Sequence, residues 1–158
     1  MSSLHEIFVS DLLTPEAIIL NLSESNKTQL LQFLCTRISE VYPDIDQKQF
    51  FADIIKRENE LSTGIGNHIA IPHTVTEHAQ KLHLLFGTHT GIDYDSLDGK
   101  PVNLIIMLAI PTNEKQLYTL FLMKISQLMG VRELRDALIN AKTPEEIIAL
   151  FKKYEKVK

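Results

Sequence analysis

The feature that most constrains the fold is an unbroken apolar run from Leu104 to Ile110 in the second half of the chain. A strand with one face in water alternates apolar and polar side chains, whereas a run that is apolar at every position is typical of a strand buried on both faces. Such strands lie inside sheets that helices cover on both sides. The run is far shorter than the roughly 20 apolar residues that cross a bilayer, so we expect no membrane insertion.

The segments around this run alternate between strand patterns and helix patterns. Further strands are predicted over residues 18–23, 69–71 and 82–88. Apolar positions at intervals of three and four predict helices from Lys27 to Pro43, from Asp44 or Asp46 to about Glu58, from Thr112 or Asn113 to Gly130, from Arg132 to Asn140 and from Thr143 to about Lys156. Strands interleaved with helices predict an α/β fold, a three-layer α/β/α sandwich in which one mixed sheet is covered by helices on both faces.

Composition narrows the class of protein further. The 158 residues correspond to about one domain, and 44% hydrophobic with 23% charged residues is typical of a globular chain. A net charge of −4 argues against a nucleic-acid partner held by phosphate attraction. Cys35, the single cysteine, has no partner for an intramolecular disulfide, and the first residues show no signal-peptide pattern. We therefore expect a single domain over residues 1–158 in a reducing, cytoplasmic compartment.

The histidines are unevenly distributed, since five of the six lie between residues 68 and 89. Four of them are spaced five residues apart: His68, His73, His78 and His83. A step of five converges several imidazoles on one ion neither on a helix nor on a strand, and no HExxH, CxxC or acidic calcium-loop pattern accompanies them. We expect no metal site, and we expect His5, His78, His83 and His89 to be ordinary surface or edge-strand residues.

The segment 62–73 differs, because each of its unusual residues has a geometric use. Gly64 and Gly66 permit positive φ and close backbone approach, which leaves amide N–H groups free to face an anion. The apolar residues that follow predict a buried strand that ends at Pro72, since proline offers no amide hydrogen to a sheet. His73 is then held at the rim of the sheet as a candidate nucleophile. The alternative is a turn without function, because the glycine spacing matches no phosphate-binding loop.

From Arg57 through the residues ENELSTGIGNHIAIPH, the chain closely resembles the active-site signature of a bacterial family. This family is the fructose/mannitol type (type 2) IIA domain of the phosphoenolpyruvate:sugar phosphotransferase system, including its nitrogen-regulatory branch. The resemblance covers about residues 7–155 and includes the stretches SDLLTPEAIILNL and GIDYDSLDGKPVNLIIMLAIP. It implies a single IIA-type phosphotransferase domain that uses no cofactor.

The resemblance also implies site residues and partners. In that family the histidine after the proline accepts a phosphoryl group from HPr or a related phosphocarrier and passes it to a IIB partner. By position this residue is His73, which would form a phosphohistidine intermediate, and Arg57 is the matching basic residue whose planar guanidinium holds phosphoryl oxygens. Backbone amides from Gly64 to Asn67 are expected to supply further hydrogen-bond donors.

The sequence departs from the family pattern at two positions. Thr74 follows the nucleophile where the family usually has glycine, and it either crowds the approaching partner or offers it a hydroxyl. The third predicted helix reads QLYTL where the family reads HLxxL, so Gln116 takes the place of a second active-site histidine. Glutamine donates a hydrogen bond but carries no positive charge and takes up no proton. Slower transfer or a different pH response would follow.

Three functions remain open at this point. The first is a phosphoryl relay between a phosphocarrier and a sugar-transporter IIB partner. The second is a regulatory protein of the same fold that controls a target protein through its phosphorylation state or by binding. The third, from another class, is a metal-binding protein that uses the clustered histidines. Neither the sugar nor the oligomeric state follows from the sequence.

Overall fold

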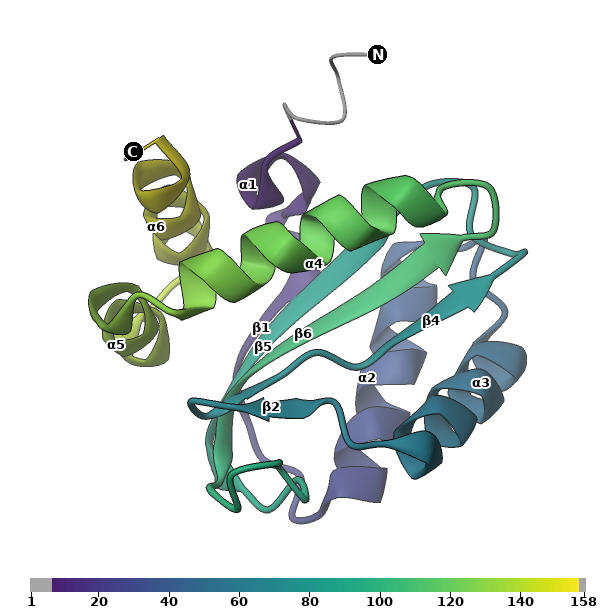
Figure 1. Cartoon of the computed structure of the whole chain (residues 1–158), viewed down its shortest axis with the longest axis horizontal. Coiled ribbons are helices and arrows are strands. Elements are labelled where there is room, and N and C mark those ends of the chain that lie inside the picture. Colours follow the sequence, from purple (N-terminus) through teal and green to yellow (C-terminus); the bar gives the residue numbers. More distant parts are fainter. Residues whose placement is uncertain (1–6, 157–158) are drawn as a thin grey trace.

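The computed structural model describes residues 7–156 of the chain, and its central element is a six-stranded mixed sheet (Figure 1). The strands are β1 (Ile18–Leu22), β2 (Gly64–Gly66), β3 (Ile69–Ala70), β4 (His73–Thr76), β5 (His83–Ile92) and β6 (Val102–Pro111). Their order is β1-β5-β6-β3-β2, and β4 also pairs with β6. β1 runs parallel to β5, and β3 and β4 run parallel to β6, whereas the pairs β5–β6 and β2–β3 are antiparallel.

Helices cover both faces of this sheet. They are α1 (Val9–Leu12), the 3-10 helix η2 (Pro15–Ala17), α2 (Lys27–Val41), α3 (Gln47–Glu60), α4 (Lys115–Met129), α5 (Arg132–Asn140) and α6 (Pro144–Lys156). α2 and α3 lie on one face, and α4, α5 and α6 lie on the other together with α1 (Figure 1). The predicted three-layer α/β/α sandwich is therefore confirmed.

Successive side chains of β6 point into two separate hydrophobic cores. Leu104, Ile106 and Leu108 belong to the core shared with α4, α5 and α6. Ile105 and Met107 belong to the core shared with α2 and α3. All of these side chains are at most 1% exposed, which confirms that the apolar run is buried on both faces.

Capping side chains begin two of the helices as expected. The Asn26 side chain accepts from the amide of Gln29 at 2.9 Å at the start of α2, and Asp46 does the same for Gln49 at 3.4 Å at the start of α3. The predicted cap of α4 at Thr112 or Asn113 is wrong. β6 extends to Pro111, the chain then turns, and α4 begins only after residue 114, without a side-chain cap.

The strand that precedes His73 differs from the prediction in one respect. β3 ends before Pro72 as expected, but the chain then resumes pairing with the same neighbour and forms β4, which the sequence analysis did not predict. The Pro72 carbonyl accepts from the amide of Leu108 at 2.9 Å, so β6 is hydrogen-bonded across the interruption. His73 is consequently the first residue of a short parallel strand.

Two of the histidines expected at the surface or a sheet edge are buried. β5 lies between β1 and β6, so it is an inner strand, and its His83 and His89 are 5% and 8% exposed. Nε2 of His83 lies 2.8 Å from a carboxylate oxygen of Asp44, and Nε2 of His89 donates to the carbonyl of Glu24 at 2.8 Å. These contacts satisfy the Nε2 atoms of the two rings, which the neighbouring strands remove from water.

Two further histidines, His68 and His78, are accessible to solvent. His78 is exposed as expected, His68 is half-buried, and His5 lies outside the described residues. Within residues 7–156, no group of three or more histidine, cysteine, aspartate or glutamate side chains is placed to hold a metal ion. None of the helices in this described part of the chain has the length and apolar character needed to cross a membrane.

Candidate functional site

His73 is held by a short hydrogen bond to the backbone just before it. Its Nδ1 lies 2.6 Å from the carbonyl oxygen of Ile71. Because a carbonyl only accepts, Nδ1 must carry the proton and donate it, which leaves the lone pair of the neutral ring on Nε2. The backbone therefore fixes both the tautomer and the orientation of the imidazole.

The surroundings of His73 also favour the neutral ring. Burial lowers the pKa of His73 below its ordinary value of 6.5, and the positive charge of Arg57 acts in the same direction. The hydrogen bond to Ile71 and the charge of Glu58 oppose this shift without cancelling it. At neutral pH the ring is thus uncharged, and a neutral imidazole nitrogen is a nucleophile.

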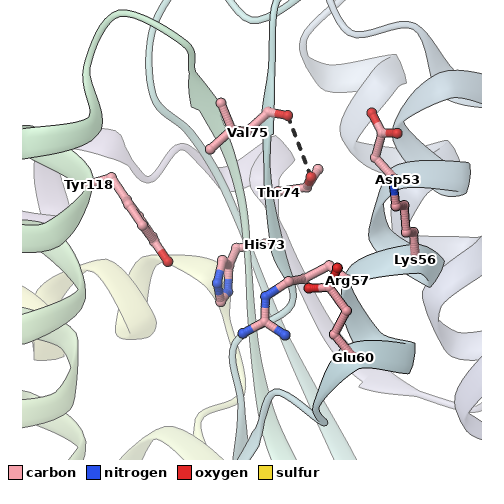
Figure 2. A pocket seen from close by; sticks show the side chains of 8 residues that line it. All are labelled: Asp53, Lys56, Arg57, Glu60, His73, Thr74, Val75 and Tyr118. Atoms are coloured by element: carbon pink, nitrogen blue, oxygen red, sulfur yellow. Dashed lines mark hydrogen bonds between the residues drawn. The ribbon is translucent and has the colours of Figure 1, made fainter.

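An open pocket of about 390 Å³ lies in front of this histidine, between α3, β4 and α4 (Figure 2). Its lining residues come from all three elements: Asp53, Lys56, Arg57, Glu60, His73, Thr74, Val75 and Tyr118. The charged members all belong to α3, and they comprise two cations and two carboxylates. The pocket therefore combines a nucleophilic ring, positive charge and free space large enough for a phosphoryl group.

Arg57 is the predicted site residue that the structure does bring to His73. It lies in the last turn of α3, and its Nη1 donates to the carbonyl of Leu61 at 2.9 Å. This bond uses one of its five N–H donors, so the remaining donors of the guanidinium stay available for a ligand. Figure 2 shows the guanidinium beside the imidazole.

Thr74 is also in the pocket, next to His73. It is half-buried, and its hydroxyl is 3.5 Å from the carbonyl of Val75, a long hydrogen bond that is easily exchanged for another partner. The hydroxyl that distinguishes this position from the family's usual glycine therefore lies on the pocket wall.

Gln116 does not belong to the lining of the His73 pocket. It is exposed near the start of α4 and lines a different pocket, with Thr112, Asn113, Glu114, Lys115 and Leu117. Leu117, between Gln116 and Tyr118, is buried, and a step of one residue turns a helix by about 100° in either direction. Gln116 and Tyr118 therefore lie on opposite flanks of that buried face, and only the flank of Tyr118 faces the histidine.

Tyr118 is the site residue that the sequence analysis missed. Its ring centroid is 5.5 Å from that of His73 with an angle of 41° between the planes, and it lines the same pocket. Burial raises the pKa of Tyr118 above its ordinary value, although the charge of Arg57 partly offsets the shift. The only signal in the sequence was its position one residue after a buried leucine of the helix stripe.

The amides around Gly64 and Asn67 do not form the predicted anion cradle. The Gly64 amide donates to the hydroxyl of Ser62 at 3.1 Å, and the Asn67 amide donates to the carboxylate of Asp98 at 3.1 Å. Both donors already have partners within the protein, and neither residue lines the pocket of His73. These two amides therefore do not face an anion in the structure, because a hydroxyl two residues away binds one and a carboxylate 31 residues further along the chain binds the other.

The packing and the backbone conformation explain why residues 64 and 66 are glycine. A Cβ at Gly64 would lie 2.5 Å from the hydroxyl oxygen of Ser96, closer than a real Cβ approaches another atom. Gly66 has a φ of +100°, a conformation that favours glycine. Together they allow the loop 93–101 to close over β2.

A buried polar cluster anchors the end of α3 that carries Arg57. Glu58 is 7% exposed, and one carboxylate oxygen lies 3.0 Å from Nζ of Lys27 and accepts from the amide of Thr63 at 3.1 Å. The other oxygen accepts from the hydroxyls of Thr63 and Tyr94. This cluster ties α3 to the start of α2 and to the segment that leads to His73.

The fold and the pocket define a class of protein: a three-layer α/β/α domain with a neutral histidine beside an arginine in an open pocket. More particularly, the chain belongs to the family described as "Phosphoenolpyruvate-dependent sugar phosphotransferase system, EIIA 2", whose sequence profile matches residues 11–154. The resemblance found in the sequence is thereby confirmed.

Individual relatives fall into a sugar branch and a nitrogen branch. The chain is 31% identical over 149 residues to the PTS system fructose-specific EIIABC component of Bacillus subtilis, covering 94% of the chain but only 24% of that protein. It is 29% identical over 142 residues to the nitrogen regulatory protein of Pseudomonas aeruginosa, covering 89% of the chain and 92% of that protein. The chain thus spans only about a quarter of the length of the first relative and nearly all of the second.

Solved structures with the same fold come from both branches. The nitrogen regulatory protein IIA-Ntr from Neisseria meningitidis superposes with a TM-score of 0.84 at 25% identity, covering 90% of this chain and 98% of that one. IIA mannitol from Escherichia coli shares the fold with a TM-score of 0.76 at 18% identity, covering 88% of this chain and 98% of that one.

Proposed function

We propose that the protein is a phosphoryl carrier that accepts a phosphoryl group on Nε2 of His73. The observation that carries this proposal is the 2.6 Å hydrogen bond from Nδ1 of His73 to the Ile71 carbonyl. It reserves Nδ1 as a donor and turns the lone pair of Nε2 into the one nucleophilic position of the ring. The lowered pKa keeps that lone pair free of a proton at neutral pH.

The transfer needs no proton movement at His73. Nε2 attacks phosphorus while the bond between phosphorus and the donor atom of the phosphocarrier breaks, and Nδ1 keeps its proton throughout. The ring becomes positively charged as the new N–P bond forms, and the Ile71 carbonyl at Nδ1–H stabilises this charge. The reverse steps deliver the group to the next acceptor.

Arg57 is proposed to bind the phosphoryl oxygens during this transfer. Charge in the transition state is spread over three equatorial oxygens, so catalysis depends mainly on alignment and on donors aimed at them. The guanidinium beside the ring is already fixed by the Leu61 carbonyl, and Lys56 adds a second positive charge to the lining. Preorganised charge of this kind lowers the barrier without reorganisation during the reaction.

The partners proposed for this relay are an HPr-like phosphocarrier and a IIB domain. A solved structure with the same fold is a complex of enzyme IIA mannitol with phosphorylated enzyme IIB mannitol from Escherichia coli, with a TM-score of 0.76 at 18% identity. The pocket that His73 lines is open rather than enclosed, so a partner protein has access to the ring.

Regulation is a second candidate function, and a specific observation favours it. The structure superposes on the nitrogen regulatory protein IIA-Ntr from Neisseria meningitidis with a TM-score of 0.84, against 0.76 for IIA mannitol from Escherichia coli. Under this alternative the phosphorylated and unphosphorylated forms differ in their binding to a target protein, and little phosphate passes to a IIB domain.

The test is incubation with phosphoenolpyruvate, the first enzyme of the system and its phosphocarrier, followed by intact-mass measurement before and after acid treatment. We expect the mass of one phosphoryl group, which acid removes. His73→Ala should abolish the labelling, and His78→Ala, which changes an exposed histidine outside the pocket, should leave it intact. Labelling that survives in His73→Ala would refute the assignment.

A second stage separates the two candidate functions. The phosphorylated protein is mixed with a purified IIB domain, and the loss of the phosphoryl group is followed over time. Rapid transfer supports the relay. Retention of the group, together with binding to a target protein that depends on phosphorylation, supports regulation.

A further inference from the structure

We infer that the hydroxyl of Tyr118 is the hydrogen-bond donor that α4 supplies to a phosphoryl group on Nε2 of His73. The inference rests on the proposed function of His73. It assigns to Tyr118 a direct contact with the transferred group. Gln116, the other polar candidate on α4, is exposed and lines a separate pocket.

The geometry places the phenol where a donor is needed. The rings of Tyr118 and His73 have their centroids 5.5 Å apart and are tilted by 41°, so they are neighbours without being stacked face to face. Figure 2 shows the hydroxyl end of Tyr118 directed toward the imidazole, with the guanidinium of Arg57 on the other side of the ring. A group on Nε2 would therefore stand between an arginine from α3 and a phenol from α4.

The charge distribution of the pocket explains why a neutral donor matters there. The charged lining residues are Asp53, Lys56, Arg57 and Glu60, and all of them come from α3. α4 contributes only Tyr118 to the lining, and no hydrogen bond of its hydroxyl occurs within the described residues. Tyr118 is thus the side chain of α4 in this lining that can donate to a phosphoryl oxygen.

The chemistry of the phenol suits this role. A hydroxyl donates only while it is protonated, and burial raises the pKa of Tyr118, so the group remains a donor across the neutral range. A hydrogen bond to a charged acceptor is stronger than one between neutral groups. Unlike a histidine in this place, the phenol adds no positive charge and needs no proton from solution.

The experiment compares Tyr118→Phe and Tyr118→Leu with wild type in the full chain. Tyr118→Phe keeps the ring and removes only the donor, and Tyr118→Leu removes both. Thr119→Val is the matched control, because Thr119 is the next residue of α4, is exposed, and bonds within its own helix to the Lys115 carbonyl at 3.2 Å. Each protein is phosphorylated by the phosphocarrier and, separately, by the small donor phosphoramidate, from which ammonia leaves as the N–P bond to His73 forms.

We expect Tyr118→Phe to slow phosphorylation of His73 by about 10- to 100-fold with both donors, the range of one hydrogen bond to a charged group. The final labelling should still reach one phosphoryl group per chain. Tyr118→Leu should be at least as slow, and Thr119→Val should match wild type. In ³¹P NMR, loss of a donor to the dianion should move the titration of the phosphoryl group to higher pH in Tyr118→Phe.

Several outcomes would overturn the inference. Tyr118→Phe with wild-type rates and an unchanged ³¹P titration would show that the hydroxyl makes no contact, and a loss confined to Tyr118→Leu would show a packing role of the ring. An equal slowing in Gln116→Ala would assign the α4 contact to Gln116 instead. If the wild-type protein is labelled on His73 by phosphoramidate but not by the phosphocarrier, the proposed relay is refuted. The role of Tyr118 is then still tested by the phosphoramidate rates of the variants.

Discussion

Removal of the Glu58 carboxylate provides the sharpest test of how the pocket is held together. Glu58→Ala deletes both oxygens of a side chain that is 3% exposed and leaves Nζ of Lys27, 3.0 Å away, without its counter-ion. The amide and hydroxyl of Thr63 and the hydroxyl of Tyr94 lose their acceptor in the same step. Because Arg57 precedes Glu58 on α3 and Thr63 leads into the segment before His73, both halves of the pocket depend on this anchor.

The cost follows from burial. Breaking a buried ion pair by removing one partner costs about 3–5 kcal/mol, because an uncompensated charge remains. Lys27 is 18% exposed, so water relieves only part of that penalty. Domains of this size lose about 2–4 °C in Tm for each kcal/mol, so we expect a decrease of about 6–20 °C. A natural domain has about 5–15 kcal/mol of stability in total, so the variant should still fold at low temperature.

The assay is urea unfolding followed by circular dichroism, with thermal unfolding alongside and phosphorylation of His73 measured at low temperature. Glu58→Gln keeps one acceptor oxygen and should lie between wild type and Glu58→Ala. Glu60→Ala is the matched control, since Glu60 is exposed two residues further along the same helix end, and such surface changes stay within about 0.5 kcal/mol. A loss below about 1 kcal/mol in Glu58→Ala, equal to that in Glu60→Ala, would refute the reasoning.

Three further predictions concern the pocket and its turn. Arg57→Ala should slow phosphorylation of His73 by about 100-fold, and Arg57→Lys should recover only part of the rate, because lysine lacks the planar guanidinium. Equal rapid-quench rates in wild type and both variants would contradict this. Since the pKa of His73 is lowered from 6.5, an NMR titration should find its ring still mostly neutral at pH 6.5. The free energy of unfolding should decrease as the pH is lowered from 6.5, because the unfolded state takes up the proton before the folded state does. A titration midpoint at or above 6.5 would contradict the burial argument. Gly64→Ala places a Cβ 2.5 Å from the Ser96 hydroxyl and should lower the free energy of unfolding by about 1–3 kcal/mol, which an unchanged urea midpoint would disprove.

The fold and the identity of the central histidine are largely encoded in local sequence. The apolar run 104–110 predicts an inner strand because burial on both faces removes the alternation of an exposed strand, and the structure confirms it. The order Pro72-His73 after a short apolar segment predicts a histidine that the backbone holds in place. In the structure the Ile71 carbonyl two residues earlier does hold it, which is again a local contact.

The surroundings of that histidine depend instead on contacts between distant residues. The amide of Asn67 was expected to face a ligand, but the carboxylate of Asp98, 31 residues further on, binds it. His83 and His89 were expected at the surface or on an edge strand, yet β5 is an inner strand because β1 and β6 pair with its two edges. Neither pairing leaves a periodic trace in the sequence near the residues it affects.

Which residue of α4 lies beside His73 is decided by tertiary structure and not by the local sequence. Gln116 and Tyr118 stand on either side of Leu117, and helical periodicity alone gives both flanks equal access to the sheet face. The rotation of α4 is set by the burial of its apolar side chains against the sheet, and that rotation turns Tyr118 toward His73 and Gln116 toward solvent. The sequence alone determined that a histidine held by the backbone follows Pro72. The packing of α4, which begins more than 40 residues later, decided which side chain meets that histidine, because the choice depends on a helix rotation that no local pattern specifies.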